Sequence, residues 1–433
     1  MEDDTWDDVA WGALPGWGPS FAPGHVEDDI EWLDSLPSHM RPFAAAFDRA
    51  SYNNVWWMFA VWHAVLGVIL RKQRTRVGGV EIDARVPVLL IGRSGTGKTR
   101  GVNLGTGLLQ EAHHFAGPMG LGDPYQVSHV TSVTDASLVG WVNWRRATKR
   151  DVEAGDARTP GDPIAAVEPG ALSWLHLLHV DEAGFVWNRS ENAPNLRAIL
   201  NQTFDADNSI GKLLRGMSPL VKDQLAFRSE TSLIAEVTDA LAPRFAHLLE
   251  GFFQRLLISA RPPPTKEEAR VNRQREVWIN RAEPRRRRAW DEEREGVVLF
   301  LEETSKRYSQ PVEWDFSQVE DNILAEVAKV ESELAFPSPS FQAVVGGFTA
   351  RLSDRIRRLA LHHCAARTLK EPLDNLHPRR VVDFDDVQLA SLVAVECLRS
   401  FLKYAYAAVP DPEAGARRAI RSRAADDRRS PPA

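Results

Sequence analysis

Residues 86–99 read VPVLLIGRSGTGKT and decide the fold of this 433-residue chain. The first six of them form an apolar run, and residues 92–99 match the pattern G-x-x-x-x-G-K-[ST] in full. A loop of this kind turns successive backbone N–H groups inward around phosphate oxygens, and the helix after it adds its positive N-terminal end. The stretch therefore predicts a strand, a phosphate-binding loop and a helix that begins near Lys98.

This loop supplies most of the predicted binding residues. Lys98 would bring a point charge to the β- and γ-phosphates, and the Thr99 hydroxyl is placed to bind Mg²⁺. The nucleotide-binding residues that we expect are Gly92, Arg93, Ser94, Gly95, Thr96, Gly97, Lys98, Thr99 and Arg100. The expected cofactors are ATP and Mg²⁺.

A second apolar run, 172–180, ends in Asp181-Glu182. A strand that ends in carboxylates suits another strand of the sheet that contains the phosphate-loop strand. In that position Asp181 would hold Mg²⁺, directly or through water, and Glu182 would orient and polarise the attacking water. The alternative is a strand exit with two surface acids. The histidines of this run, His176 and His179, are three residues apart, so in a strand they point to opposite faces and cannot share a metal ion.

The rest of the chain alternates apolar runs with helical patterns, which is typical of a parallel α/β sheet covered on both faces. Strands are expected at 86–91, 128–134, 172–180, 231–238 and 252–259, and a loop at 151–170. A helix containing Leu138, Val139 and Trp141 should follow the second of these strands. Later helices are expected at 317–335, 341–368 and 384–408. The predicted organisation is an acidic, Trp-containing and disordered tail (1–36), a helical leader (37–80), a core (81–262), a charged linker or insertion (263–296), a helical domain (297–410) and a basic disordered tail (411–433).

The composition, 43% hydrophobic and 26% charged, excludes a wholly disordered, collagenous or coiled-coil chain. The formal net charge of −6 combines ten carboxylates in the first 40 residues with a slightly cationic remainder. Two cysteines, Cys364 and Cys397, suit a reducing compartment and are expected in the core. The run 55–70 is shorter than the roughly 20 residues of a spanning helix. We expect a cytoplasmic protein that does not enter a membrane.

With the loop 92–99 and the Asp181-Glu182 pair, the chain resembles the AAA+-like P-loop ATPases over roughly residues 40–405. It is similar in particular to the helicase-type ATPase domains that accompany primases on phages and other mobile elements. The resemblance implies an α/β P-loop NTPase fold with a mainly parallel sheet covered by helices, followed by an all-helical C-terminal lid domain. It also implies Mg²⁺-dependent ATP hydrolysis and a homo-oligomer, of which a ring is one form.

The resemblance also assigns roles to three single residues. Thr238 stands where the family has a polar sensor that reaches the γ-phosphate or the attacking water, although it could equally be a plain strand-ending Thr. Arg255, in the segment GFFQRLLIS, corresponds to an arginine finger that acts on a neighbouring subunit's nucleotide; a structural salt bridge is the alternative. Arg351 corresponds to a lid arginine that binds nucleotide, against a solvated basic helix face.

Several features depart from the family. The chain has no primase module and no obvious winged-helix or pore-loop motif, and the segments 151–170 and 263–296 have no counterpart. DNA could bind the cluster Arg285, Arg286, Arg287 and Arg288, but the mixed charge around it is also typical of a solvated helix. The acidic N-terminal tail could dock on another protein or compete with DNA for these arginines.

Two functions therefore remain open at this point. The first is a DNA helicase or translocase-type motor of a phage or mobile element. The second is a regulatory or defence switch that assembles when it binds ATP, hydrolyses it slowly and does not move along DNA. A packaging motor would need a C-terminal nuclease, for which no carboxylate spacing is found. A small-molecule kinase suits Glu182 poorly, because the residue is placed to activate water.

Overall fold

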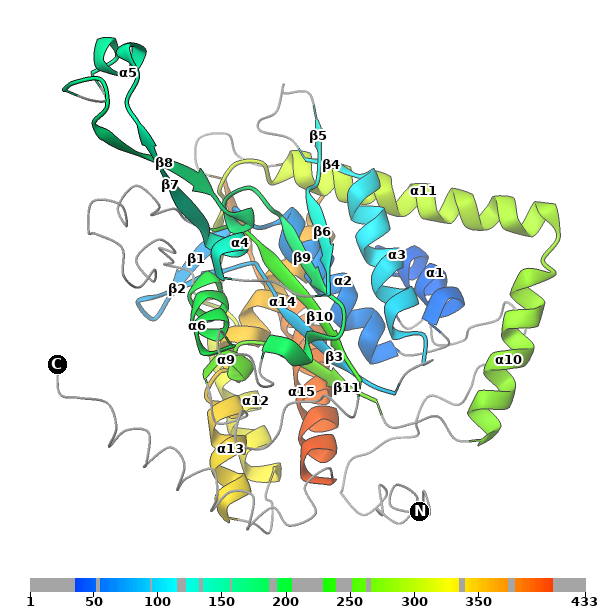
Figure 1. The fold of residues 1–433 in the computed structure, drawn as a ribbon. Coiled ribbons are helices and arrows are strands. Elements are labelled where there is room, and N and C mark those ends of the chain that lie inside the picture. The colour runs from blue at the N-terminus through cyan, green and yellow to red at the C-terminus, as the bar shows by residue number, and fades with distance from the viewer. Residues whose placement is uncertain are drawn as a thin grey trace, which may run out of the picture.

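The computed structural model describes residues 36–51, 55–93, 96–114, 122–131, 135–155, 158–186, 193–204, 229–238, 251–261, 266–334, 339–372 and 378–407. Within these ranges a five-stranded parallel sheet lies at the centre of the molecule, in the order β11-β3-β10-β9-β6 (Figure 1). Its strands are β3 (Val88–Ile91), β6 (Val127–Val130), β9 (Leu177–Val180), β10 (Ser232–Val237) and β11 (Leu257–Ala260). The expected parallel α/β sheet is confirmed, and each predicted apolar run overlaps one of its strands.

Two of the predicted strands are shorter than their apolar runs. The run 172–180 begins in a short 3-10 helix, η2 (Ala171–Ser173), and becomes a strand only at Leu177. The run 252–259 begins in a short helix, α9 (Gly251–Gln254), which buries Phe252 and Phe253 before β11 starts. Apolar residues in a short run can be buried equally well by a helical turn or by a strand, and this explains both differences.

The N-terminal helices α1 (Arg41–Ser51) and α2 (Val55–Ile69) join the sheet to the C-terminal region. Helix α2 is apolar on all sides and packs on β3, β10 and β11, on α3 (Lys98–Glu111), and on two C-terminal helices. This burial explains its membrane-like composition. Among the described residues, no helix is long and apolar enough to span a bilayer.

The C-terminal region is mainly helical, with α12 (Glu320–Glu333), α13 (Pro339–Thr349), α14 (Leu352–Arg367) and α15 (Phe384–Ala407). The predicted helix 341–368 is in fact two helices, α13 and α14, which meet at 350–351. An all-helical region was expected, but β12 (Glu313–Asp315) and β13 (Arg379–Val381) form a short parallel pair within it. Helix α15 packs on α14 and on β11, so this region lies directly against the sheet.

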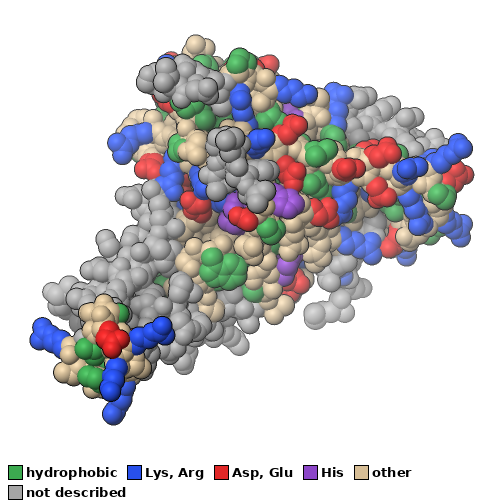
Figure 2. Space-filling model, turned by 90° about the horizontal axis from the view of Figure 1, so that it is seen from above, with side chains coloured by type: hydrophobic (Ala, Val, Ile, Leu, Met, Phe, Trp, Pro, Cys, Tyr) green, Lys and Arg blue, Asp and Glu red, His purple; other side chains and the backbone are tan. Residues whose placement is uncertain are grey.

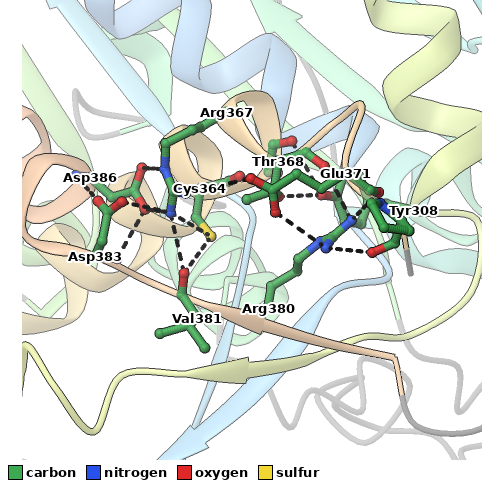
Figure 3. A network of polar contacts seen from close by, with 11 residues as sticks. Tyr308, Cys364, Arg367, Thr368, Glu371, Arg380, Val381, Asp383 and Asp386 are labelled. Atoms are coloured by element: carbon green, nitrogen blue, oxygen red, sulfur yellow. Dashed lines mark hydrogen bonds and ion pairs between the residues drawn. The ribbon is translucent and has the colours of Figure 1, made fainter. Parts of the chain in front are cut away.

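Two arginines anchor the segment between α14 and α15 (Figure 3). Arg367 donates to Asp386 Oδ2 at 2.6 Å, and Arg380 donates to the carbonyl oxygen of Thr368 at 3.1 Å. Cys364 lies between them, and its burial raises the pKa of its thiol. Like Cys397 of α15, it is a free and buried cysteine, as expected for a small core residue.

Two parts of the chain project from the sheet (Figure 1). One is the antiparallel hairpin β7 (Gly140–Arg146) and β8 (Pro163–Pro169), with α5 (Lys149–Glu153) at its tip. The expected loop 151–170 is therefore largely α5 and β8, and the helix predicted to include Trp141 ends at Val139 (α4, Asp135–Val139). The other projection consists of α10 (Lys266–Asn280) and α11 (Pro284–Arg307), which are formed largely by the predicted insertion 263–296.

The remaining described elements are short. They are β1 (Arg74–Val77), β2 (Val80–Asp83), β4 (His113–His114), β5 (Asp123–Pro124), η3 (Ala183–Val186) and α6 (Ala193–Thr203). A turn at Gly78-Gly79 joins β1 to β2, and both glycines have positive φ, the left-handed region that glycine enters without strain.

Candidate functional site

A cavity of about 610 Å³ lies at the carboxyl ends of the parallel strands. This is the edge at which open α/β sheets bind ligands. The cavity is lined by Arg93, Thr96, Gly97, Lys98, Thr99, Arg100, Asp181, Glu182, Thr238, Arg261, Ala269, Asn272, Arg273 and Glu276. The predicted loop, the Asp181-Glu182 pair and Thr238 therefore lie around the same cavity, although they are far apart in the sequence.

The loop has the local structure that its glycines predict. Gly97 has a φ of 83° and is the N-cap of α3, so the helix begins at Lys98 as expected. Gly92 donates its backbone N–H to the carbonyl of Val237 at 3.2 Å, which ties the loop to β10. Thr96 Oγ1 donates to the carbonyl of Arg93 at 2.8 Å. Two predicted loop residues, Ser94 and Gly95, lie outside the described residues.

Asp181 and Glu182 directly follow β9. The backbone N–H of Asp181 donates to Val130 on β6 at 2.9 Å, so the start of this turn is held by the neighbouring strand. Glu182 has a φ of 52°, a left-handed conformation that is uncommon for a residue with a side chain. Such backbone strain is concentrated at functional sites. The conformation is consistent with a turn shaped to place a carboxylate.

Thr238 lies next to Glu182 because β10 is paired with β9. Its hydroxyl is 3.3 Å and its backbone nitrogen 3.5 Å from Glu182 Oε2. Thr238 therefore contacts the residue expected to polarise water, and both line the cavity.

Glu236 is a functional candidate that the sequence analysis missed. It is completely buried on β10, where it accepts a hydrogen bond from Thr99 Oγ1 at 2.9 Å and lies 3.8 Å from Lys98 Nζ. On its other side His179 Nε2 is 2.6 Å away. An acidic residue inside the otherwise apolar strand SLIAEV was a signal that could have identified it, because a buried carboxylate needs partners.

The two histidines of the 172–180 run have separate surroundings, as predicted. His176 Nδ1 accepts the backbone N–H of Gln126 at 2.9 Å. His179 contacts Glu236 and also His129, with the two Nδ1 atoms 2.6 Å apart. Burial is the main cause that lowers the pKa of His176, to about 3, so its ring is neutral near neutral pH.

Helix α10 closes one side of the cavity, which was not foreseen from the sequence. It contributes Arg273 and Glu276, and Glu276 pairs with Arg100 at 3.2 Å. The cations on the lining (Arg93, Lys98, Arg100, Arg261 and Arg273) outnumber its acids (Asp181, Glu182 and Glu276). A cavity with this balance favours an anionic ligand such as a polyphosphate.

The oxygen atoms of the site fit a magnesium ion that is bound together with a nucleotide. The Thr99 hydroxyl and the Asp181 carboxylate both line the cavity, and Glu236 contacts Thr99. Hydroxyl and carboxylate oxygens, completed by phosphate oxygens, are the ligands that Mg²⁺ takes in nucleotide sites. Thr99 and Asp181 are the residues of the lining that would hold the ion.

Arg255 and Arg351 lie together, but away from this cavity. Both line a smaller cavity at the opposite ends of the strands, beside Pro87 and Leu257. Arg255 Nη1 donates to the carbonyl of Gly251 at 2.9 Å, and Arg351 Nη1 is 3.9 Å from Asp354 Oδ2. Neither residue lines the cavity that holds Lys98 in the same chain.

The arginine cluster 285–288 forms the exposed first turn of α11. Arg286 stacks over the Trp278 ring at 4.8 Å, Arg287 donates to the carbonyl of Asn280, and Arg288 is 3.9 Å from Glu292. Basic and acidic side chains are interspersed over the end of this projection (Figure 2). The cluster is distant in the sequence from the loop 92–99 and is not part of the cavity lining.

No protein-family model matches the chain, and no curated protein shows significant sequence similarity to it. The geometry of the cavity is therefore the main support for a function.

Proposed function

We propose that this chain is a P-loop ATPase that hydrolyses ATP with Mg²⁺, as a DNA helicase or translocase-type motor. The observation that carries the proposal is the single cavity around which Lys98, Thr99, Asp181, Glu182 and Thr238 meet. Its volume of about 610 Å³ is within the range of small-ligand sites, and its lining is rich in cations.

Each of these residues has a distinct part in the proposed reaction. Lys98 and the start of α3 neutralise charge on the phosphates, and a bound Mg²⁺ would add further neutralisation. Glu182 orients and polarises the attacking water. Thr238, 3.3 Å from Glu182, holds that carboxylate and reaches toward the same water. Catalysis then depends on positioning and electrostatic stabilisation.

The separate position of Arg255 and Arg351 supports an assembly of several copies. The two residues lie at the opposite ends of the strands from the cavity that contains Lys98 of their own chain. We propose that Arg255 stabilises transition-state charge at the nucleotide of a neighbouring copy, and that Arg351 reaches the nucleotide from the same side. A homo-oligomer, for which a ring is the simplest closed form, would bring the two cavities together.

DNA is the polymer that we propose for the motor. Arg285, Arg286, Arg287 and Arg288 are exposed at the start of α11, and the projecting hairpin carries exposed Arg146, Lys149 and Arg150 near its tip (Figure 2). Clustered cations on projections can neutralise DNA phosphates, with an affinity that falls as salt rises.

The experiment is an ATPase assay on the full chain, with and without single-stranded and double-stranded DNA, at two salt concentrations and with the oligomeric mass measured. We expect Mg²⁺-dependent turnover that Lys98→Ala abolishes and that DNA stimulates at the lower salt. Turnover that Lys98→Ala leaves intact would contradict the ATPase. Turnover that is slow and unaffected by DNA would instead identify a nucleotide-driven switch.

A further inference from the structure

Glu236 belongs to a line of polar contacts that crosses three strands of the sheet. His129 Nδ1 and His179 Nδ1 are 2.6 Å apart, and His179 Nε2 is 2.6 Å from Glu236 Oε1. Glu236 Oε2 in turn accepts the hydrogen bond of Thr99 Oγ1 at 2.9 Å. The line runs from the exposed His129 on β6, through β9 and β10, to the first turn of α3.

When the rings of His129 and His179 are both neutral, the hydrogen bonds of this line are all donated toward Glu236. A carboxylate only accepts hydrogen bonds, so Thr99 and His179 both donate to Glu236. His179 then has its proton on Nε2 and accepts at Nδ1, where His129 donates. Both oxygens of Glu236 are therefore fixed by neighbours, in the way that histidines and carboxylates orient each other around metal ions.

The charge of Glu236 needs a cation nearby. Its side chain is 0% exposed, and Lys98 Nζ at 3.8 Å is the positive group beside it. A buried charge without a partner costs several kcal/mol. If Lys98 turns toward a phosphate, as the proposed function requires, Glu236 loses part of this compensation. A divalent cation that arrives with the nucleotide would restore it.

The geometry of Glu236 and Thr99 suits such a cation. Magnesium binds oxygens at 2.0–2.1 Å in an octahedron, so two neighbouring ligands lie roughly 2.9 Å apart. Glu236 Oε2 and Thr99 Oγ1 are separated by 2.9 Å. Magnesium in nucleotide sites also takes one or two carboxylates and completes its shell with phosphates and water. Glu236 can therefore serve beside Asp181 without excluding the phosphates.

We propose that Glu236 is a ligand of the Mg²⁺ ion in the nucleotide site, with His179 as its positioning residue. In the empty site Glu236 balances Lys98, and in the loaded site it binds Mg²⁺ together with Thr99. This assignment rests on the proposed nucleotide site, and it adds a carboxylate that the motif 92–99 and the Asp181-Glu182 pair do not contain.

The test measures binding rather than turnover. A fluorescent, non-hydrolysable ATP analogue is titrated into wild-type chain and Glu236→Gln, first in EDTA and then at increasing Mg²⁺. Glutamine keeps the size of the side chain, and its single amide oxygen can still accept from His179 while its NH2 group donates to Thr99 Oγ1. We expect Glu236→Gln to bind the analogue in EDTA at least as tightly as wild type, because Lys98 then has no carboxylate at position 236 to pair with and can turn toward a phosphate. We expect the Mg²⁺ concentration for half-maximal enhancement to rise on the order of 10–100-fold.

The matched control is Glu302→Gln, which alters a carboxylate–histidine contact outside the cavity, since Glu302 Oε1 is 2.7 Å from His113 Nδ1. It should leave the Mg²⁺ dependence unchanged. If Glu236→Gln proves unstable in a thermal melt, His179→Gln tests the same assignment. This variant keeps the charge of Glu236 but weakens the contact that orients its carboxylate. The Mg²⁺ concentration for half-maximal enhancement should therefore rise, while binding of the analogue in EDTA is retained.

Manganese gives an independent readout, because the electron paramagnetic resonance signal of free Mn²⁺ decreases when the ion binds. In the presence of the ATP analogue, Glu236→Gln should bind Mn²⁺ more weakly than wild type. Equal Mg²⁺ and Mn²⁺ affinities in the two proteins would overturn the assignment of Glu236. Wild-type chain that does not bind the analogue, or binds it equally well after Lys98→Ala, would instead refute the nucleotide site itself.

Discussion

Trp57 occupies the space that a side chain on Gly92 would need. A Cβ atom added at Gly92 would lie 2.6 Å from Trp57 Cζ2, well inside van der Waals contact. Trp57 is fully buried in α2. This helix therefore packs against the loop 92–99 at Gly92. The first glycine of the motif is therefore required by packing against Trp57.

The first prediction follows from this contact. Gly92→Ala should destabilise the chain by about 1–3 kcal/mol, the usual cost of overpacking, and should weaken nucleotide binding because the loop must move. Thermal or denaturant unfolding and analogue titration measure the two effects. The double variant Gly92→Ala with Trp57→Phe should lose less than the sum of the two single variants, because the smaller ring leaves room for the methyl group.

Gly107 provides the control for this prediction. It lies within α3, and among the described residues a Cβ there would meet Arg294 Nη2 alone, at 3.7 Å. Gly107→Ala should therefore be neutral or stabilising by up to about 1 kcal/mol, the difference in helix propensity. If Gly92→Ala behaves like Gly107→Ala, Trp57 does not restrict the loop.

The second prediction concerns the pair Glu182 and Thr238. Glu182→Gln should lower kcat by about 10²–10⁴-fold while the chain still binds ATP, because the amide cannot polarise water as a carboxylate does. Thr238→Val should lower kcat less, since it removes only the hydroxyl 3.3 Å from Glu182, and Thr238→Ser should restore it. Steady-state turnover and analogue affinity separate the two effects. A large rise in KM with kcat unchanged would contradict both roles.

The sequence predicted the parts of this site that are continuous along the chain. The run 88–91, the loop and the start of α3 are specified by residues next to one another, and the strand before Asp181 is specified in the same way. Glu236 was missed because its role depends on the pairing of β10 with β9 and β3, which brings His179 and Thr99 to it from distant segments. The role of α10 as a cavity wall is likewise a matter of tertiary packing, and its mixed charge gives no local sign of it.

The strand boundaries and the positions of Arg255 and Arg351 also depend on tertiary packing, which the local sequence does not show. Phe252 and Phe253 are apolar enough for a strand, but packing places them in a helical turn. Arg255 and Arg351 were assigned separately by resemblance, and only the fold shows that they line a common cavity. Whether they act on a nucleotide stays a prediction.

The third prediction tests that action by mixing subunits. Arg255→Ala should bind ATP as wild type does and should lose turnover, because the residue is absent from the cavity of its own chain. Lys98→Ala should also be inactive, since it cannot bind nucleotide. A mixture of the two inactive variants should recover part of the wild-type ATPase activity, because some neighbouring pairs combine an intact cavity with an intact Arg255. A mixture that stays inactive while the oligomer exchanges subunits would argue for a structural Arg255.

The fourth prediction concerns four histidines, three of them buried and His39 half-buried, that join α2 and α14 to the segment before α1. His63 Nδ1 and His362 Nδ1 are 3.0 Å apart, and His363 stacks edge-on against His63 with ring centroids 4.9 Å apart. Burial lowers the pKa of His39 and of His362 to about 4. It also lowers the pKa values of His63 and His363 well below their usual value. The core therefore holds all four rings in the neutral form.

These lowered pKa values determine how the stability of the fold changes with pH. The unfolded chain takes up protons on these histidines below about pH 6.5, whereas the folded chain does so only near or below pH 4. The unfolded state then binds more protons between these values, so stability is fully present above pH 6.5 and is lost as the pH falls. Denaturant unfolding at a series of pH values should show a loss of roughly 1 kcal/mol per pH unit for each such histidine.

His363→Phe isolates one of these contributions. Among the described residues neither buried ring nitrogen of His363 has a hydrogen-bond partner, and the ring borders a cavity of about 790 Å³, so phenylalanine removes no hydrogen bond seen there and has room. The variant should be at least as stable as wild type at pH 5 and should show a shallower loss of stability below pH 6.5. His113→Gln, at an exposed ring paired with Glu302, should not make that loss shallower. A pH slope unchanged in His363→Phe would show that this ring does not titrate on unfolding.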